Sequence, residues 1–186
     1  MILGLDISTS CTGASLISTG GELLHTFAIK PAGEDMFQKA NSFRIQLNQW
    51  LRQCKVTKQH ISAVYIEENL QGFRPGLSSA GTLLTLARFN GVASYIAFLE
   101  LGIVPEYINV TAARKLVSLK IDRSRDTKEQ VLEWATAKFG YTPTSRAVKT
   151  GKKKGQMVIE THHFDIADSI VIAMAGLEQR KSADVK

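Results

Sequence analysis

The sequence predicts an α/β fold in which a mixed five-stranded sheet carries helices on both faces. Three observations predict it: short turns join the first three strand-like segments, helix-like segments separate the later strands, and the spacing of apolar residues changes accordingly. Short turns give antiparallel neighbours, whereas a strand, a crossover helix and a second strand require parallel pairing. We expect one domain over residues 1–180 and a polar tail over residues 181–186.

Three strands are expected at the start of the chain, over residues 2–7, 13–18 and 23–29. The first is an apolar run, the second alternates small and apolar residues, and the third follows a Gly20-Gly21 turn. Because both connections are short, these strands should form an antiparallel meander.

A helix and a fourth strand are expected next. Apolar residues recur at helical spacing between positions 35 and 54. The buried face of this helix is expected to consist of Phe37, Ala40, Phe43, Leu47, Trp50 and Leu51. Residues 61–66 are a compact apolar strand, and Glu67 and Glu68 come directly after it.

The second half of the chain alternates between apolar and polar segments. We expect a loop at 71–77, a long apolar helix at 78–101, a strand at 104–108, helices at 111–119 and 128–139, a polar segment with at most a short hairpin at 140–161, and an amphipathic helix at 165–179. Helices between the later strands should cover both faces of the sheet.

Composition and charge limit the classes of function. We expect no apolar run of membrane-spanning length, and residues 1–6 lack the basic segment and apolar core of a signal peptide, so we expect a cytoplasmic protein without a membrane partner. The net charge of +6 and the pI near 9.4 suit a polyanionic partner. Cys11 and Cys54 show no metal-ligand spacing and are expected to be reduced thiols.

Four carboxylates fall where the predicted sheet would present them together. Asp6 lies near the end of the first strand among apolar residues, where a carboxylate is costly without a partner or a cation. Glu67 ends the fourth strand, and if these strands are parallel neighbours, both carboxylates emerge at one edge. Asp165 and Asp168 are one helical turn apart and share a helix face.

Four converging carboxylates would repel one another unless a cation lay between them. Mg²⁺ and Mn²⁺ prefer such oxygen ligands. Two of these ions roughly 4 Å apart can activate a water and stabilise the leaving oxygen of a phosphodiester. Two other interpretations stay open from the residues alone: an aspartate pair can cap a helix, and a Glu-Glu pair can be a solvated strand end.

Three motifs resemble those of the RuvC-like Holliday junction resolvases, which belong to the RNase H-like and retroviral integrase superfamily. These motifs are Gly4-Leu5-Asp6 followed by Ser8, Thr12 and Gly13; Tyr65-Ile66-Glu67; and Phe164-Asp165-Ile166-Ala167-Asp168-Ser169. The similarity covers most of the chain in matching order and spacing. One departure is that family members often carry proline and glycine after the first aspartate, where this chain has Ile7 and Ser8.

The resemblance implies an RNase H-like fold and a crossover junction endonuclease of DNA recombination and repair. It implies two-metal hydrolysis, with Mg²⁺, or Mn²⁺ as a substitute, bound by Asp6, Glu67, Asp165 and Asp168. It also implies that an aromatic residue of the loop after Glu67 stacks on bases, and Phe73 fits this role. Lys128 resembles a lysine that the family keeps near the scissile phosphate.

Basic residues gather before the last acidic motif. The residues we assign to DNA binding are Phe73, Arg74, Lys115, Lys120, Arg125, Lys128, Lys152, Lys153 and Lys154. The alternative interpretation of the consecutive lysines Lys152, Lys153 and Lys154 is a solvated loop without a role in binding. His162 and His163 lie beside the last acids and are either proton-transfer groups or ordinary surface histidines.

A four-way junction has near two-fold symmetry, so a homodimer with two sites is expected, paired through the apolar helix at 78–101. Such a protein would be nucleoid-associated or phage-encoded. Three alternatives stay open: an RNase H-like or YqgF-like nuclease acting on RNA or an RNA–DNA hybrid, a fragment of an actin-like sugar kinase or ATPase, and a DNA-binding module without activity.

Overall fold

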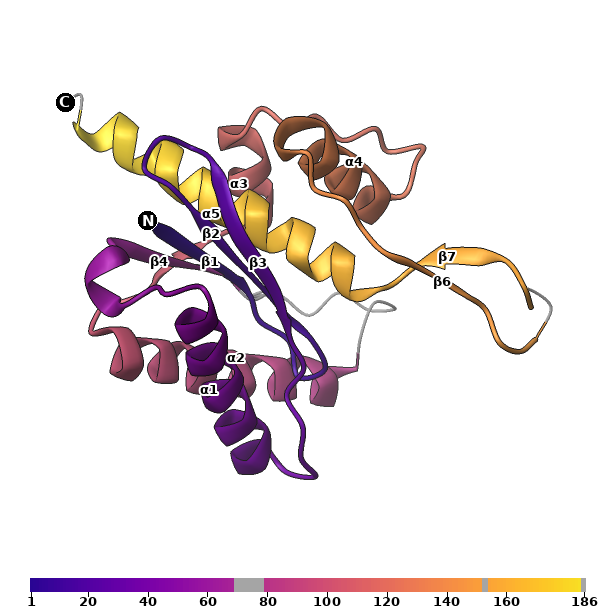
Figure 1. Cartoon of the computed structure of the whole chain (residues 1–186), viewed down its shortest axis with the longest axis horizontal. Helices are drawn as coiled ribbons and strands as arrows, with labels where there is room; N and C mark the ends of the chain where they lie inside the picture. Colours follow the sequence, from indigo (N-terminus) through magenta and orange to yellow (C-terminus); the bar gives the residue numbers. More distant parts are fainter. Residues whose placement is uncertain (69–78, 152–153, 185–186) are drawn as a thin grey trace.

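The sheet of the computed structural model has the predicted mixed topology (Figure 1), and the structure describes residues 1–68, 79–151 and 154–184. Its strands are β1 (Ile2–Asp6), β2 (Thr12–Ile17), β3 (Leu23–Ile29), β4 (Ala63–Glu67) and β5 (Glu106–Ile108), in the order β3-β2-β1-β4-β5. The meander β1-β2-β3 is antiparallel, and β4 runs parallel to both β1 and β5. The first and fourth strands are thus parallel neighbours, which is the condition under which Asp6 and Glu67 were expected to emerge together.

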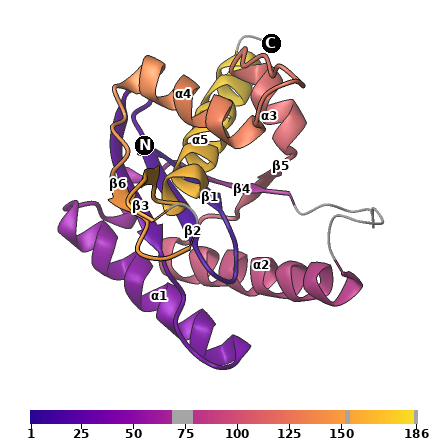
Figure 2. The ribbon, with the colours of Figure 1, turned by 90° about the vertical axis from the view of Figure 1, so that its right-hand side faces the viewer.

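Helices cover both faces of this sheet, as predicted (Figures 1 and 2). One face carries α1 (Met36–Gln53) and α2 (Ala80–Leu101), and the other carries α3 (Val110–Leu116), α4 (Thr127–Phe139) and α5 (His162–Asp184). Each face has its own apolar core, because successive side chains of a strand point to opposite faces.

The first helix departs from its predicted face at one residue. Ala40, Phe43, Leu47, Trp50 and Leu51 are buried as expected, but the side chain of Phe37 is 83% exposed. Helical spacing places Phe37 on the apolar side. It occupies the first turn of α1, however, two residues after the Asp35 N-cap, and it makes no part of the core. The prediction for Phe37 is therefore wrong.

The last helix, α5, is longer than the helix that the apolar pattern predicted at 165–179. It begins at His162, three residues before the predicted start, and continues to Asp184, so residues 181–184 of the expected polar tail are helical. The segment before it contains the predicted short hairpin, formed by β6 (Ser145–Ala147) and β7 (Met157–Ile159). We call the segment from residue 145 to residue 159 the basic hairpin; its described parts, residues 145–151 and 154–159, project from the body of the molecule near the start of α5 (Figure 1).

Among the described residues, α2 is the helix that is long and apolar enough to cross a membrane by length and composition. The expectation that no segment reaches this limit is therefore wrong for α2. Helices of protein cores meet the same criterion, and α2 buries Phe89, Ala93 and Ala97 against the sheet.

Small residues bring α5 unusually close to the sheet. A Cβ atom added at Gly4 would overlap the backbone carbonyl of Ser169, and one added at Gly13 would overlap that of Asp165. At the first of these contacts the Ser15 hydroxyl donates a hydrogen bond of 2.8 Å to the same Ser169 carbonyl. The first half of α5 thus rests directly on the backbone of β1 and β2.

Replacing Gly13 with alanine should therefore push the start of α5 away from the sheet. We expect Gly13→Ala to lower the free energy of unfolding by about 1–3 kcal/mol, as overpacking of a filled core does. Gly81→Ala is the matched control, because Gly81 is exposed in the first turn of α2 and its added Cβ would meet only the Ser79 hydroxyl, at 3.8 Å. Urea denaturation measures both, and equal stability of the two variants would contradict the prediction.

Candidate active site

The alternation of side chains along the strands brings Asp6 and Glu67 to one face of the sheet. On β1, Leu3 and Leu5 enter the core beneath α1 and α2, so Ile2 and Asp6 point to the α5 side. On β4, Tyr65 packs in the α5 core, and Glu67 follows it two residues later. The parallel pairing of the two strands therefore places both carboxylates at the same edge.

The helix α5 supplies Asp165 and Asp168. Ile166, Ala167 and Ile170 are buried against the sheet and fix the rotation of the helix. Because α5 starts at His162, Asp165 is the fourth helical residue and not its N-cap, which removes the capping interpretation of the aspartate pair.

These elements bring the four predicted carboxylates together. Asp6, Glu67 and Asp165 line a cavity of about 270 Å³ with Lys128, and Asp168 is held deeper, with 13% of its side chain exposed. The carboxyl groups of Asp6 and Glu67 are within hydrogen-bonding distance of each other. The cavity is thus a strongly acidic recess at the carboxyl ends of two parallel strands.

Burial raises the pKa of all four carboxyl groups, and repulsion from neighbouring carboxylates raises those of Asp6 and Asp168 further. Burial raises the pKa of Asp6 well above its usual range, and Glu67, Asp168 and Asp165 add to the effect. Asp6 is therefore the group that keeps a proton and donates it to Glu67, whose own pKa is raised by burial. Burial also raises the pKa of Asp165, while a hydrogen bond with the Cys11 thiol opposes this.

Two basic side chains partly balance these charges. The guanidinium of Arg114 on α3 lies 3.7 Å from Asp168, and the ammonium of Lys128 on α4 lies 3.9 Å from Asp165. Burial and Glu67 still raise the pKa of Asp168 to about 6, although both bases oppose the shift. Two basic groups thus cannot neutralise four ionised carboxylates in this recess.

The residues present fit a divalent cation. Asp168 Oδ1 is buried and has no hydrogen-bond partner, since the Arg114 guanidinium lies 3.7 Å from this oxygen, beyond hydrogen-bonding range. A buried carboxylate oxygen of this kind is costly, and a bound metal ion would offset the cost. The four acidic side chains offer carboxylate oxygens, which are the ligands that Mg²⁺ and Mn²⁺ prefer. Asp6, Glu67, Asp165 and Asp168 are therefore the residues that could hold such ions.

Two neighbours of the recess were missed by the sequence interpretation. Arg114 contacts Asp168, whereas the neighbouring Lys115, which we assign to DNA binding, is exposed. The apolar face formed by Ala113 and Val117 could have indicated this. Asn90 of α2 also lines the cavity, and its side-chain amide donates to the backbone carbonyl of Glu67 at 3.2 Å.

The other predicted DNA-binding residues either lie outside the cavity lining or fall outside the described residues. Lys120 and Lys154 are exposed, and Arg125 is exposed and forms an ion pair with Glu133 on α4. Phe73, Arg74, Lys152 and Lys153 lie outside the residues that the structure describes. Of the predicted bases, Lys128 is the one that lines the acidic cavity.

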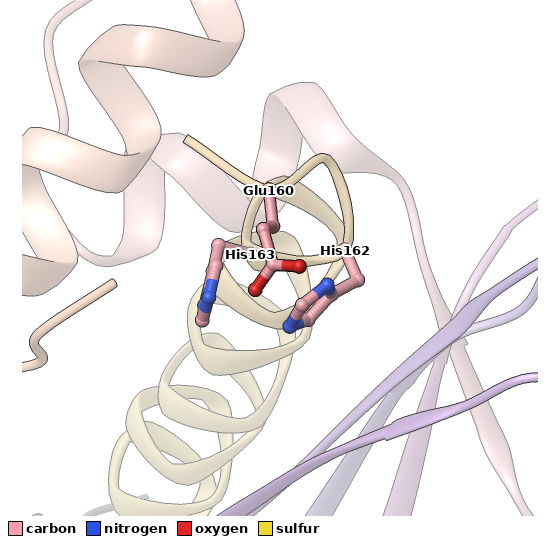
Figure 3. A group of neighbouring side chains, drawn as sticks. All are labelled: Glu160, His162 and His163. Atoms are coloured by element: carbon pink, nitrogen blue, oxygen red, sulfur yellow. The ribbon is translucent and has the colours of Figure 1, made fainter. Parts of the chain in front are cut away.

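A second group of potential ligands lies at the first turn of α5. Glu160, His162 and His163 have ligand atoms within 4.8 Å of one another (Figure 3). Both ring nitrogens of His163 are already hydrogen bonded, however: Tyr141 contacts Nδ1, and the Thr144 backbone N–H donates to Nε2 at 2.9 Å. Because His163 is also buried, this group connects segments of the chain and does not resemble an open metal centre.

Solved structures share this architecture, whereas no protein-family model and no curated protein matches the sequence. Thermus thermophilus RuvC, in complex with a Holliday junction substrate, superposes with a TM-score of 0.61 at 17% identity over 97% of this chain and 94% of that chain. A second structure of Thermus thermophilus RuvC gives the same TM-score and identity, over 97% and 96%. The chain has the RuvC fold.

The yeast mitochondrial Holliday junction resolvase Ydc2 has the same fold. Its TM-score is 0.57 at 15% identity, over 99% of this chain and 80% of that chain. The predicted RNase H-like fold class is thus confirmed by neighbours that match almost the whole chain, and the acidic recess lies within that shared region.

The raised pKa of Asp168 predicts how stability depends on pH when no metal is bound. The carboxyl group titrates near pH 6 in the folded protein and near 4 when unfolded, so the folded state holds more protons between these values. The free energy of unfolding should therefore fall as the pH rises from 4 to 7. Asp168→Asn should flatten this fall and add on the order of 2 kcal/mol of stability at pH 7.5.

Urea denaturation in EDTA at pH 5 and pH 7.5 measures this effect. The exposed Glu133→Gln variant is the control and should keep the wild-type dependence. Adding Mg²⁺ should stabilise the wild type at pH 7.5 more than Asp168→Asn. Identical pH profiles for wild type and Asp168→Asn would contradict the assignment.

Proposed function

We propose that this chain is a metal-dependent, structure-selective endonuclease that cleaves Holliday junctions or other branched DNA. The observation that carries the proposal is the convergence of Asp6, Glu67, Asp165 and Asp168 in one recess of a RuvC fold. One of the structural neighbours is in complex with a Holliday junction substrate, and another is a Holliday junction resolvase, which supports this substrate class.

The four carboxylates would hold two Mg²⁺ ions, with Mn²⁺ as a substitute. Bound Mg²⁺ supplies a nucleophilic water near neutral pH and stabilises the leaving oxygen of a phosphodiester. Asp6 must lose the proton that it donates to Glu67 before it can bind a cation, so cation binding and proton release are coupled here. Activity should therefore increase with pH over the range in which Asp6 and Asp168 ionise.

Two basic residues have separate tasks in this proposal. Lys128 is exposed and lines the cavity, so its ammonium can bind the phosphate that enters. Arg114 is mostly covered and lies against Asp168, so it orients that carboxylate and favours its ionised form. Asn90 fixes the end of β4 through the Glu67 carbonyl and so helps to hold the Glu67 side chain in the recess.

We also propose that two copies pair through α2. The outer side of α2 and the segment that follows expose large apolar side chains: Leu84, Tyr95, Phe98, Leu99, Val104 and Tyr107. Contiguous exposed apolar surface of this kind is typical of protein interfaces. Because α2 also contributes Asn90 to the recess, pairing here would fix the spacing of two sites, as two nicks in a four-way junction require. Such a dimer would act in the cytoplasm, on the nucleoid or on phage DNA.

Removing any one carboxylate should abolish cleavage. Each of Asp6→Asn, Glu67→Gln, Asp165→Asn and Asp168→Asn removes a cation ligand, so we expect kcat to fall by at least roughly 100-fold, which corresponds to about 3 kcal/mol. Folding and DNA binding should persist, because the change relieves repulsion. The assay is Mg²⁺-dependent cutting of a synthetic four-way junction, with Glu133→Gln as the control.

The same assay distinguishes the substrate classes. The four-way junction is compared with a linear duplex, a flap and an RNA–DNA hybrid of equal length. Preferred cutting of the hybrid would replace junction resolution with an RNase H-like activity. Near wild-type turnover of one acid variant would remove that residue from the metal site.

Charging the apolar surface of α2 should separate the dimer. We expect Tyr95→Glu and Leu99→Glu to give monomers at micromolar concentration, since both side chains are about 60% exposed and support no core. Phe37→Glu is the control, because Phe37 is exposed on α1 instead. Light scattering measures the mass, and a wild-type monomer that cuts both strands in one binding event would refute the dimer.

A further inference from the structure

The basic hairpin is the most strongly charged element of the chain. Residues 145–159 contain five lysines and arginines and no acidic residue, so they account for most of the net charge of +6. Its two strands pair only with each other among the described residues and form a separate two-stranded sheet. Arg146, Lys149 and Lys154 are all exposed. The hairpin thus presents positive charge without taking part in either apolar core.

A hairpin of this size needs support to keep one orientation, since an isolated two-stranded ribbon is only marginally stable. The support is the cluster around His163 at its base. Thr144, which precedes β6, contacts His163 Nε2 through both its backbone N–H and its hydroxyl, and the hydroxyl also donates to Glu160 at 2.6 Å. Tyr141 closes the cluster on the other ring nitrogen (Figure 3 shows the side chains of Glu160 and His163).

This cluster joins the hairpin to the helix that carries the acids. His163 lies two residues before Asp165, and its backbone N–H donates to the Glu160 carbonyl at the end of the hairpin. The basic hairpin therefore leads into the first turn of α5 (Figure 1), and this turn also carries Asp165. A polyanion held by the hairpin would pass directly beside the acidic recess.

We propose that the basic hairpin binds the groove of a DNA duplex arm next to the cleavage site. This inference rests on the proposed nuclease function. A two-stranded ribbon fits the major groove of B-form DNA, which is about 12 Å wide. Residues 145–150 can reach at most about 20 Å from the base of the hairpin, so it contacts the arm nearest the acids and does not span a whole junction. No acidic residue of the hairpin opposes the phosphates.

The partner is double-stranded DNA and not single-stranded or A-form nucleic acid. Counterion release from phosphates should dominate the affinity. A-form RNA has a deep, narrow major groove that a ribbon enters poorly. The hairpin should therefore contribute to binding of DNA duplexes and junctions alike, and much less to RNA duplexes.

The test compares three triple variants by fluorescence anisotropy in EDTA, where no cleavage occurs. Arg146→Ala/Lys149→Ala/Lys154→Ala removes three hairpin charges. Arg52→Ala/Lys55→Ala/Lys58→Ala removes three exposed charges that precede β4, near the amino end of that strand, whereas the acids lie at its carboxyl end. Arg146→Lys/Lys149→Arg/Lys154→Arg keeps the charge of the hairpin. Each is titrated against a DNA duplex, a four-way junction, an RNA duplex and a single strand from 50 to 200 mM salt.

We expect the hairpin alanine variant to bind the DNA duplex and the junction roughly 10- to 100-fold more weakly. Its log–log salt slope should be smaller by about 0.9 for each DNA phosphate that the hairpin no longer neutralises. The other two variants should bind like the wild type. An unchanged slope, or an equal weakening in the control at β4, would overturn the inference. A weakening confined to RNA or to single strands would also overturn it.

This binding experiment separates the two proposals. If the wild type cuts no junction in Mg²⁺ but the hairpin variant still loses duplex affinity, the nuclease function fails and the duplex-binding hairpin stands. If junctions are cut while the salt slope is unchanged, only the inference about the hairpin fails.

Discussion

The contact between α5 and the backbone of the first two strands is the constraint on which the rest of the structure depends. Gly4 and Gly13 leave no side chain between helix and sheet, and the hydrogen bond from Ser15 to the Ser169 carbonyl fixes how far the helix can slide along its axis. Carboxylates from β1, β4 and α5 therefore meet at one place. Their positions follow from rigid, buried elements, which locate charged groups more accurately than loops do.

The same constraint makes the recess unfavourable without a cation. Repulsion and burial raise the pKa of Asp6 and Asp168, and one oxygen of Asp168 has no hydrogen-bond partner. The fold can hold these groups because two apolar cores, one on each face of the sheet, stabilise the elements that carry them. The acidic recess therefore lowers the stability of the metal-free protein, and a bound cation would raise it again. Functional sites commonly reduce stability in this way.

The sequence predicted the parts of the fold and site that depend on local periodicity. Local patterns placed Asp6 and Glu67 at the ends of their strands, but their meeting depended on the assumption that the first and fourth strands are parallel neighbours, which the structure bears out. The predicted burial of Phe37 was wrong because helical spacing shows which residues share a helix face but not how much of that face other elements cover. Arg114, the His163 cluster and the glycine contacts of α5 were missed, because they join residues that lie far apart in sequence.

The acidic recess also explains why a cluster of positive charge lies on the basic hairpin and not beside the carboxylates. Bases close to the carboxylates, such as Lys128 and Arg114, compete with a cation for the same oxygens, so adding more of them would weaken metal binding. A recess without them would repel the phosphates of a nucleic acid. Positive charge on a projecting hairpin resolves this conflict, because beyond about 10 Å salt screens it from the recess while it still contacts a long polyanion directly. The His163 cluster then keeps that distant charge in register with Asp165, since both belong to the first turn of α5.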